Sequence, residues 1–164
     1  MLWKCELCKH LSIGESALDF CPVCGARKFS AYTPSLDLSG TVTEQNLWKA
    51  FAGESQANRK YTAFALLADI IGDKDAAEAF KVAASDETTH ALSLLAWLKG
   101  FGTTKENLLA ARDGENYEND VMYPEFARMA KAEGFEELAT YFEFVARHEK
   151  RHAGVYDKLA STRE

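Results

Sequence analysis

Apolar residues recur at helical spacing along most of the chain from Thr41 onward, and no stretch there alternates as a strand would. This periodicity predicts four long helices, at residues 43–71, 74–99, 104–132 and 135–161. The breaks between them contain glycines that commonly end helices: Gly72, Gly100, Gly102 and Gly134. The sequence therefore predicts a mainly α protein in which four helices pack as a bundle.

Two local signals refine these helices. Thr41 and Glu44 have the spacing of a capping box, in which the two side chains bind free backbone N–H groups at a helix start. Pro124 falls inside the third helix and lacks the N–H that a helix needs there. We expect it to kink that helix or to leave a local bulge.

Each predicted helix carries acidic residues on its apolar face, near the middle of the helix. An unpaired buried carboxylate costs several kcal/mol, so a single one would ordinarily be a solvated edge position. The residues in question are Glu54, Glu87, His90, Glu115, Glu118, Glu149 and His152. Because the same anomaly recurs in all four helices at matching depth, we predict that these side chains meet around metal ions.

The spacing and chemistry of these residues point to two metal ions. Glu87 with His90, and Glu149 with His152, are separated by three residues and so share a helix face. Sites rich in carboxylates with imidazole suit iron or manganese. One glutamate from each of two helices and Glu-x-x-His from the other two is the ligand pattern of ferritin-like di-iron bundles.

The four cysteines lie in the first 24 residues, as two pairs with two residues between partners: Cys5, Cys8, Cys21 and Cys24. Such pairs converge on one ion and form a tetrahedral tetrathiolate site. The second pair, with Pro22 and a following Gly25, resembles a rubredoxin knuckle, whereas the first has Lys9 where glycine is usual. Iron and zinc both suit four thiolates, so both remain open. We predict a rubredoxin-like domain at residues 1–34, a linker at 35–42 and the bundle at 43–164.

Composition narrows the function further. The net charge of −6 argues against nucleic acid and anionic membrane surfaces as partners. No apolar run reaches the roughly 18 residues of a membrane span, and the N-terminus lacks signal-peptide features. Reduced thiols and the absence of a leader predict a cytoplasmic protein. His10 and His148 fit no motif and are predicted to lie on the surface.

Taken together, these motifs resemble the rubrerythrin family in its reverse arrangement, with the rubredoxin-like module first. The matching segments are Phe51–Ser55, Glu87–His90, Glu115–Glu118, Met122–Phe126 and Glu149–His152. The resemblance covers nearly the whole chain. It implies a non-haem di-iron peroxidase that reduces hydrogen peroxide to water, with the tetrathiolate iron delivering electrons.

The resemblance also implies a role for each side chain. Glu87 and Glu149 would bridge two irons, with Glu54 terminal on one and Glu115 and His152 on the other. Glu118 and His90 would exchange as ligands to the first iron as its redox state changes. Tyr61 and Tyr123 match family tyrosines that hydrogen-bond the carboxylates. An NAD(P)H-dependent reductase is the implied electron donor.

The connection between the second and third helices constrains the assembly. Those two helices run parallel in ferritin-like bundles. The connection from the end of the second helix to the start of the third would then have to span about 40 Å, by helical rise. About five loop residues reach only roughly 17 Å. Either the bundle is a plain up-down-up-down one, or two chains exchange helix pairs. We favour a domain-swapped homodimer.

Two rival functions remain at this stage. A ferritin-like ferroxidase would use the same carboxylates but would not need an electron-delivering tetrathiolate. A zinc ribbon on a helical interaction module would be colourless, whereas a ferric tetrathiolate is red. Oxygen-activating hydroxylation is a weaker third alternative, because no substrate pocket can be read from the sequence.

Overall fold

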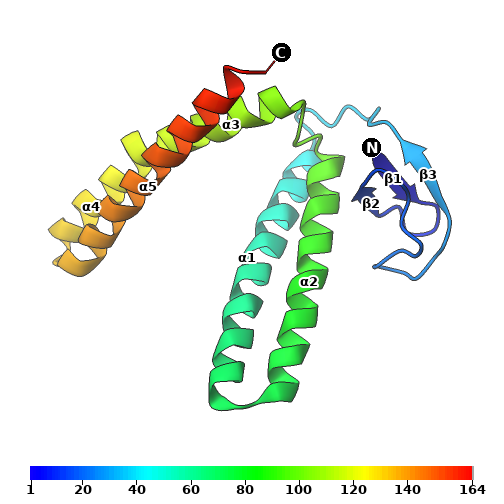
Figure 1. Cartoon of the computed structure of the whole chain (residues 1–164), viewed down its shortest axis with the longest axis horizontal. Helices are drawn as coiled ribbons and strands as arrows, with labels where there is room; N and C mark the ends of the chain where they lie inside the picture. The colour runs from blue at the N-terminus through cyan, green and yellow to red at the C-terminus, as the bar shows by residue number, and fades with distance from the viewer. Residues whose placement is uncertain (164) are drawn as a thin grey trace. The chain divides into compact units, whose positions relative to one another are not determined.

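The computed structural model describes residues 1–163 and divides into two compact units, the first ending at Gly100 and the second beginning at Phe101. A small antiparallel sheet and two helices form the first unit, and the remaining helices form the second (Figure 1). This composition confirms the mainly α class and the small cysteine-bearing module at the N-terminus. None of the described helices is long and apolar enough to cross a membrane.

The sheet of the first unit has three short strands, β1 (Leu2–Cys5), β2 (Leu11–Ile13) and β3 (Phe29–Tyr32), in the order β2-β1-β3. Both pairings are antiparallel, with Lys4 opposite Leu11 and Cys5 opposite Phe29. The central strand thus ends at Cys5, and the first cysteine pair spans the turn that leads from β1 to β2. The sheet is the scaffold that holds one side of the cysteine cluster.

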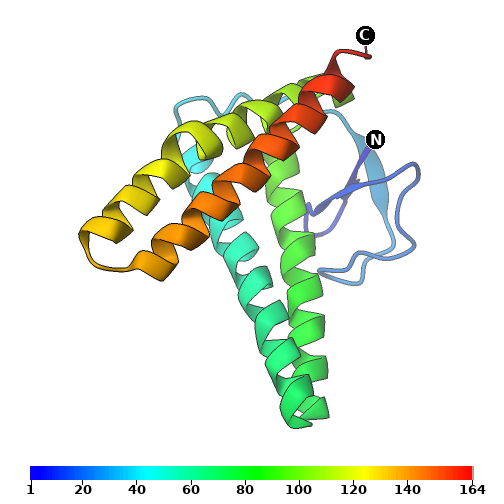
Figure 2. The same cartoon turned by 60° about the vertical axis from the view of Figure 1, so that its left-hand side comes forward.

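Two long helices complete the first unit as an antiparallel hairpin, α1 (Val42–Ile71) and α2 (Lys74–Trp97), visible from a second side in Figure 2. Gly72 ends α1 in the left-handed conformation, with φ of 84°, which glycine adopts at little steric cost. Both helices match the predicted ranges closely, although α2 ends two residues before the predicted 99.

The second unit contains α3 (Thr104–Tyr117), a π-helical segment η1 (Glu118–Met122), α4 (Tyr123–Ala132) and α5 (Glu136–Ala160). The first three form the predicted third helix, and the π-helical turn is the bulge expected next to Pro124. The Tyr123 N–H donates to the Glu118 carbonyl, five residues back, in the π-helical pattern. Such bulges occur frequently at functional sites.

Helix caps are only partly as predicted. The Glu44 N–H donates to the Thr41 hydroxyl at 3.1 Å, but the Glu44 carboxylate accepts from Gly40 rather than from Thr41. A complete capping box instead starts α3: the Glu106 N–H donates to the Thr103 hydroxyl, and the Thr103 N–H donates to the Glu106 carboxylate at 2.7 Å. Thr103 therefore fixes where α3 begins.

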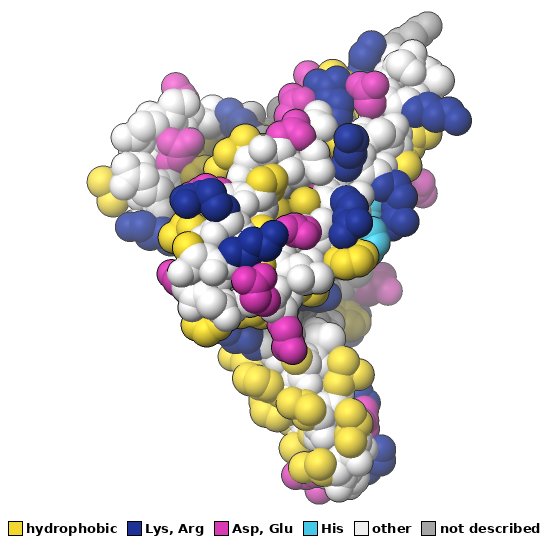
Figure 3. All heavy atoms as spheres, turned by 90° about the vertical axis from the view of Figure 1, so that its left-hand side faces the viewer, with side chains coloured by type: hydrophobic (Ala, Val, Ile, Leu, Met, Phe, Trp, Pro, Cys, Tyr) yellow, Lys and Arg dark blue, Asp and Glu magenta, His cyan; other side chains and the backbone are white. Residues whose placement is uncertain are grey.

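The helices bury small side chains and leave large ones accessible. Among the described residues, every buried apolar side chain of α1 to α5 is an alanine. Ile70 and Ile71 of α1 are 79% and 80% exposed, and apolar side chains gather over the free end of the α1–α2 hairpin (Figure 3). Leu47, Phe51 and Tyr61 of α1 are only half-buried. The α1–α2 hairpin thus retains exposed apolar surface.

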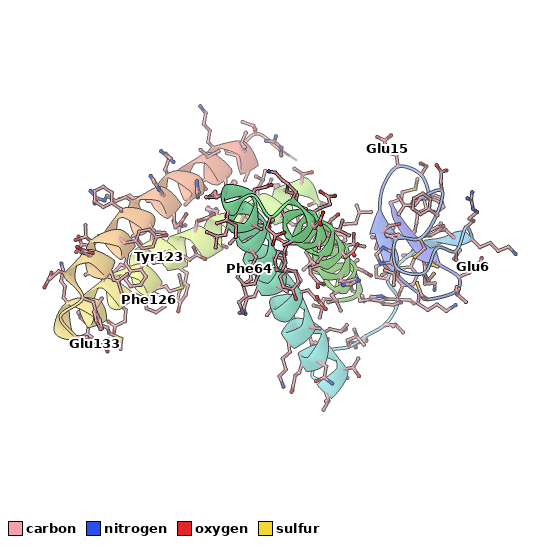
Figure 4. All side chains as sticks on the ribbon, turned by 90° about the horizontal axis from the view of Figure 1, so that it is seen from below. Glu6, Glu15, Phe64, Tyr123, Phe126 and Glu133 are labelled. Carbon is pink, nitrogen blue, oxygen red and sulfur yellow. The ribbon has the colours of Figure 1, made fainter. Side chains whose placement is uncertain are left out.

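Aromatic side chains pack the second unit around the π-helical turn. The Tyr123 ring lies 6.2 Å from that of Phe126 and 6.1 Å from that of Phe142, between centroids (Figure 4). Phe142 also packs against the buried alanines Ala127, Ala130 and Ala139. These contacts join α4 to α5 and hold the chain on the C-terminal side of the bulge.

We expect Thr103→Ala to destabilise the protein, because it removes the hydroxyl that accepts from Glu106. The loss of such a cap costs about 1 kcal/mol, or about 2–4 °C in Tm for a chain of this size. Thermal unfolding followed by circular dichroism measures the change. Thr104→Ala, at the adjacent exposed threonine, is the matched control and should leave Tm nearly unaltered; equal shifts would contradict the assignment of the cap.

Candidate metal centres

The four cysteines come together as predicted. Their sulfur atoms all lie within 4.8 Å of one another, with 3.6 Å between Cys5 and Cys24 and 3.6 Å between Cys8 and Cys21. All four are free thiols, which excludes a disulfide framework in this structure. Four sulfurs in such a cluster suit one tetrahedral metal ion.

The two cysteine pairs adopt the same turn although their sequences differ. Lys9 and Gly25 both have left-handed backbones, with φ of 67° and 73°. The Lys9 N–H donates to the Cys5 carbonyl at 3.1 Å, and the Gly25 N–H donates to the Cys21 carbonyl at 2.8 Å. Lysine therefore occupies the usual glycine position without altering the turn, and the first pair retains rubredoxin-like geometry.

The environment of the sulfurs favours a bound cation. A hydrogen bond from the backbone of Cys8 is the main cause that lowers the pKa of Cys5 to about 7. Burial raises the pKa of Cys8 to about 12 and also raises that of Cys21. A metal ion would favour the thiolate form of all four cysteines, because it supplies positive charge next to the sulfurs.

Carboxylates and a histidine also meet between α1 and α2. Glu54, Glu87 and His90 each offer one ligand atom, and these atoms lie within 4.8 Å of one another. His90 Nδ1 is 2.9 Å from Glu87 and 3.9 Å from Glu54. The i, i+3 spacing places Glu87 and His90 on one face of α2, opposite Glu54 on α1, as the sequence predicts.

A second triplet repeats this arrangement in the other unit. Glu115 of α3 meets Glu149 and His152 of α5, again with all ligand atoms within 4.8 Å. His152 Nδ1 lies 2.8 Å from Glu149 and 3.6 Å from Glu115. Six of the seven residues predicted as carboxylate or imidazole ligands therefore form two equivalent half-sites of two glutamates and one histidine.

The pKa shifts of the glutamates reflect how close the carboxylates lie to one another in each half-site. A hydrogen bond with Glu87, followed by burial, raises the pKa of Glu54, whereas the pKa of Glu87 falls because it shares this bond. Burial, followed by a hydrogen bond with Glu149, raises the pKa of Glu115. One carboxylate in each triplet thus retains a proton more readily than usual. Divalent or trivalent cations can take over this role, and this donor set fits iron.

Glu118, the seventh predicted ligand, belongs to neither triplet. It is half-buried at the first residue of η1, and its negative charge contributes to raising the pKa of Glu115. Burial, and then the Glu118 charge, raise the pKa of Tyr123. Glu118 thus lies near the second half-site and near Tyr123. The other predicted tyrosine, Tyr61, packs against the rings of Phe64 and Phe80.

His10 is the residue whose placement the sequence prediction missed. It is buried, with 8% exposed, rather than on the surface. Burial, and next the charge of His90, lower its pKa. Its position immediately before the apolar start of β2 was a weak signal of burial. His148 is exposed, as predicted.

Comparisons with known proteins agree with this geometry. A family profile described as rubrerythrin matches residues 45–160, and one described as rubrerythrin, rubredoxin-like domain, matches residues 3–29. A rubrerythrin of Porphyromonas gingivalis is 39% identical over 132 residues, covering 73% of this chain and 66% of that relative. A rubrerythrin of Nitratidesulfovibrio vulgaris is 38% identical over 128 residues, covering 70% and 67%. The chain thus spans about two thirds of the length of these two relatives.

A further relative matches over nearly its whole length. Reverse rubrerythrin-1 of Clostridium acetobutylicum is 29% identical over 174 residues, covering 96% of this chain and 95% of the relative. Its similarity therefore includes both the cysteine module and the helices, in the same order along the chain.

If Glu87 is a ligand, Glu87→Ala should lower the iron content of the carboxylate sites, because it removes the oxygen that lies nearest to His90. The adjacent, exposed Asp86 provides a matched control in Asp86→Ala. Elemental analysis per chain measures bound iron. We expect a loss of at least one iron in Glu87→Ala and none in Asp86→Ala, while the absorbance of the tetrathiolate stays the same in both. An unchanged iron content in Glu87→Ala would contradict the assignment.

Proposed function

Because the chain belongs to the rubrerythrin family, whose members are di-iron proteins of oxidative-stress defence, we propose that it is a peroxidase that reduces hydrogen peroxide to water. The observation that carries this proposal is the presence in one chain of two carboxylate–histidine triplets and a tetrathiolate cluster. We propose residues 1–34 as the electron-delivering domain, 35–42 as a linker, and 43–164 as the catalytic bundle.

The reaction needs two electrons and two protons for each peroxide, and yields two water molecules. When bound, a pair of ferrous ions supplies both electrons to one peroxide and polarises its oxygens. In our proposal the residues of the two triplets would hold these ions, and Glu87 and Glu149 would be ligands to both. The five glutamates carry one more charge than two ferrous ions and one less than two ferric ions. The four cysteines would hold an iron that passes on electrons one at a time, received from an NAD(P)H-dependent reductase.

Glu118 is the carboxylate that we expect to move during turnover, in exchange with His90. It stands outside both triplets, and it lies at the start of η1, where the backbone departs from α-helical hydrogen bonding. Its charge is close enough to raise the pKa values of Glu115 and Tyr123. Approach of Glu118 would compensate the charge of the oxidised cluster, and its withdrawal would open a position for peroxide. In this proposal Tyr61 and Tyr123 support the carboxylates.

Glu118→Ala should impair peroxide turnover while leaving two irons bound, because the six residues of the triplets remain. We expect a fall in kcat/KM of at least about ten-fold, equivalent to about 1.4 kcal/mol of transition-state stabilisation. The assay mixes fully reduced, iron-loaded protein with hydrogen peroxide without oxygen and follows the return of the red ferric tetrathiolate.

Asp120→Ala is the matched control, since Asp120 is an exposed acid in the same π-helical segment. It should turn over peroxide at the normal rate. Normal turnover in Glu118→Ala would exclude this role for Glu118. A native protein that stayed colourless with its full metal content would instead favour a zinc-ribbon module, and uptake of many irons per chain would favour storage.

We also propose that the active protein is a homodimer in which two chains exchange helix pairs. Glu87 lies 10 residues before the end of α2, and Glu115 lies 11 residues after the start of α3. In a ferritin-like bundle with parallel α2 and α3, the connection would span about 30 Å along the axis. The seven steps from Trp97 to Thr104 reach about 24 Å when fully extended. Exchange between two chains removes this conflict.

The exposed apolar side chains support a second copy as partner. Leu66, Leu67 and Ile70 are 61%, 61% and 79% exposed. At 100° per residue they lie roughly 120°, 140° and 160° around α1 from Glu54, so closing one bundle around the carboxylates would not cover them. A patch of this kind on a soluble domain typically marks an interaction surface. A second copy would supply a matching patch.

Mixed dimers distinguish exchanged from unexchanged helix pairs. In an exchanged dimer of Glu87→Ala and Glu149→Ala chains, one cluster receives both substitutions and the other receives none. Co-expression of these two variants should therefore restore about one normal cluster per mixed dimer, measured as peroxide turnover and bound iron of the purified hybrid. Glu87→Ala with Glu54→Ala, both in the first hairpin, should restore none. No restoration in the first hybrid, or a stable monomer with intact iron sites, would contradict exchange.

A further inference from the structure

The cysteine module is fastened to α2 by a buried hydrogen bond. The Leu11 N–H of β2 donates to the Ser93 hydroxyl oxygen at 2.9 Å. Leu11 is 1% exposed and Ser93 is 8% exposed, so water does not compete freely for this bond. Ser93 stands three residues, or about one helical turn, after His90 on the same helix. The contact therefore joins the module to α2 close to the first half-site.

The same peptide group also holds the cysteine cluster. The carbonyl of His10, which forms this peptide with Leu11 N, accepts from the Cys5 N–H at 2.9 Å. One rigid, planar peptide thus bonds to Cys5 at its oxygen and to Ser93 at its nitrogen. Hydrogen bonds in such a series polarise and strengthen one another. The resulting path from the thiolate of Cys5 to α2 contains only covalent bonds and two hydrogen bonds.

Two other contacts define the orientation of the module. The rings of Tyr32 and Trp97 pack with centroids 5.2 Å apart, about one turn of α2 beyond Ser93. A cavity of about 480 Å³ is lined on one side by Cys8 and His10, and on the other by Glu54 and His90. The thiolate cluster and the first half-site therefore border the same space within one unit of one chain.

We propose that Ser93 is a positioning residue, which fixes the tetrathiolate module on the α2 helix of its own chain so that electrons enter the half-site of Glu54, Glu87 and His90 in that chain. The electrons would leave the ferrous tetrathiolate singly, through the peptide between His10 and Leu11. Two such transfers, with re-reduction of the iron by the NAD(P)H-dependent reductase between them, balance the reduction of one peroxide. The direction of transfer rests on the proposed peroxidase function, whereas the docking of the module does not.

The hydroxyl is the necessary feature of Ser93. A buried N–H without an acceptor is destabilising, so removal of the oxygen leaves the Leu11 N–H unpaired and weakens docking. Ser12, in the same strand as Leu11, provides a contrast, because its buried hydroxyl oxygen has no hydrogen-bond partner among the described residues. Ser12→Ala is thus a control that removes a serine hydroxyl from the module but leaves the connecting peptide intact.

Amide hydrogen exchange tests docking independently of turnover. In the metal-loaded protein the Leu11 amide should be protected, and Ser93→Ala should speed its exchange about five-fold, the effect expected for one lost hydrogen bond. Ser12→Ala should not change the rate, and Ser93→Thr, which keeps a hydroxyl acceptor, should largely restore protection. Rapid exchange of Leu11 in the native protein, or equal rates in Ser93→Ala and native protein, would overturn the docking role.

Stopped-flow absorbance tests delivery of electrons. After anaerobic reduction and mixing with hydrogen peroxide, Ser93→Ala should oxidise its di-iron site at the native rate but show tetrathiolate oxidation slowed by about five-fold or more. Ser12→Ala and Ser93→Thr should behave as the native protein. Faster exchange with unchanged tetrathiolate oxidation would overturn the electron route while leaving docking intact. If native tetrathiolate were not oxidised by peroxide at all, the peroxidase proposal would fail, and the exchange experiment would still decide the docking role.

Discussion

Carboxylates placed inside a helical bundle need positive charge, and much of this structure follows from that requirement. Each helix hairpin brings together two glutamates and a histidine. The hydrogen bond with Glu87, followed by burial, raises the pKa of Glu54, and burial, followed by the hydrogen bond with Glu149, raises the pKa of Glu115. A proton on such a glutamate lowers the repulsion between the carboxylates of its half-site. Metal ions lower this repulsion further and also form bonds to the carboxylate oxygens. The cysteine cluster presents the same problem with thiolates. Without metal, the carboxylates and thiolates at these sites repel one another, and metal binding removes this repulsion.

The buried apolar side chains of the helices are small, and this allows the metal-binding side chains to meet. Alanines such as Ala84 and Ala146 form the buried apolar surface of the helices, which lets paired helices approach closely and brings short carboxylate and imidazole side chains within reach of one another. The larger apolar residues remain on the outer surfaces of each hairpin, where a second layer of helices can cover them. In the proposed dimer each hairpin would contribute one triplet to a shared cluster and one apolar face to a shared core.

The sequence predicted the features that depend on spacing along one helix. The bounds of α1, the pairing of Glu87 with His90 and the bulge beside Pro124 follow from periodicity and from the missing proline N–H. Features set by tertiary contacts were not predictable in this way. Burial of His10 depends on packing of the module against α2, and Lys9 reaches a left-handed backbone because the cysteine turn imposes it. A residue-type rule would place glycine there.

The short connection between α2 and α3 links assembly to electron transfer. Because Leu98 to Thr103 cannot carry the chain along the length of a bundle, exchange would give each cluster α1 and α2 from one copy and α3 and α5 from the other. The cysteine module, however, is fixed to α2 through Leu11 and Ser93, so it follows the first hairpin of its own chain. Each cluster would then have one tetrathiolate donor bound to the half-site it serves, whichever copy completes the other half. The proposed dimer and the proposed electron route are therefore compatible, since both depend on α2.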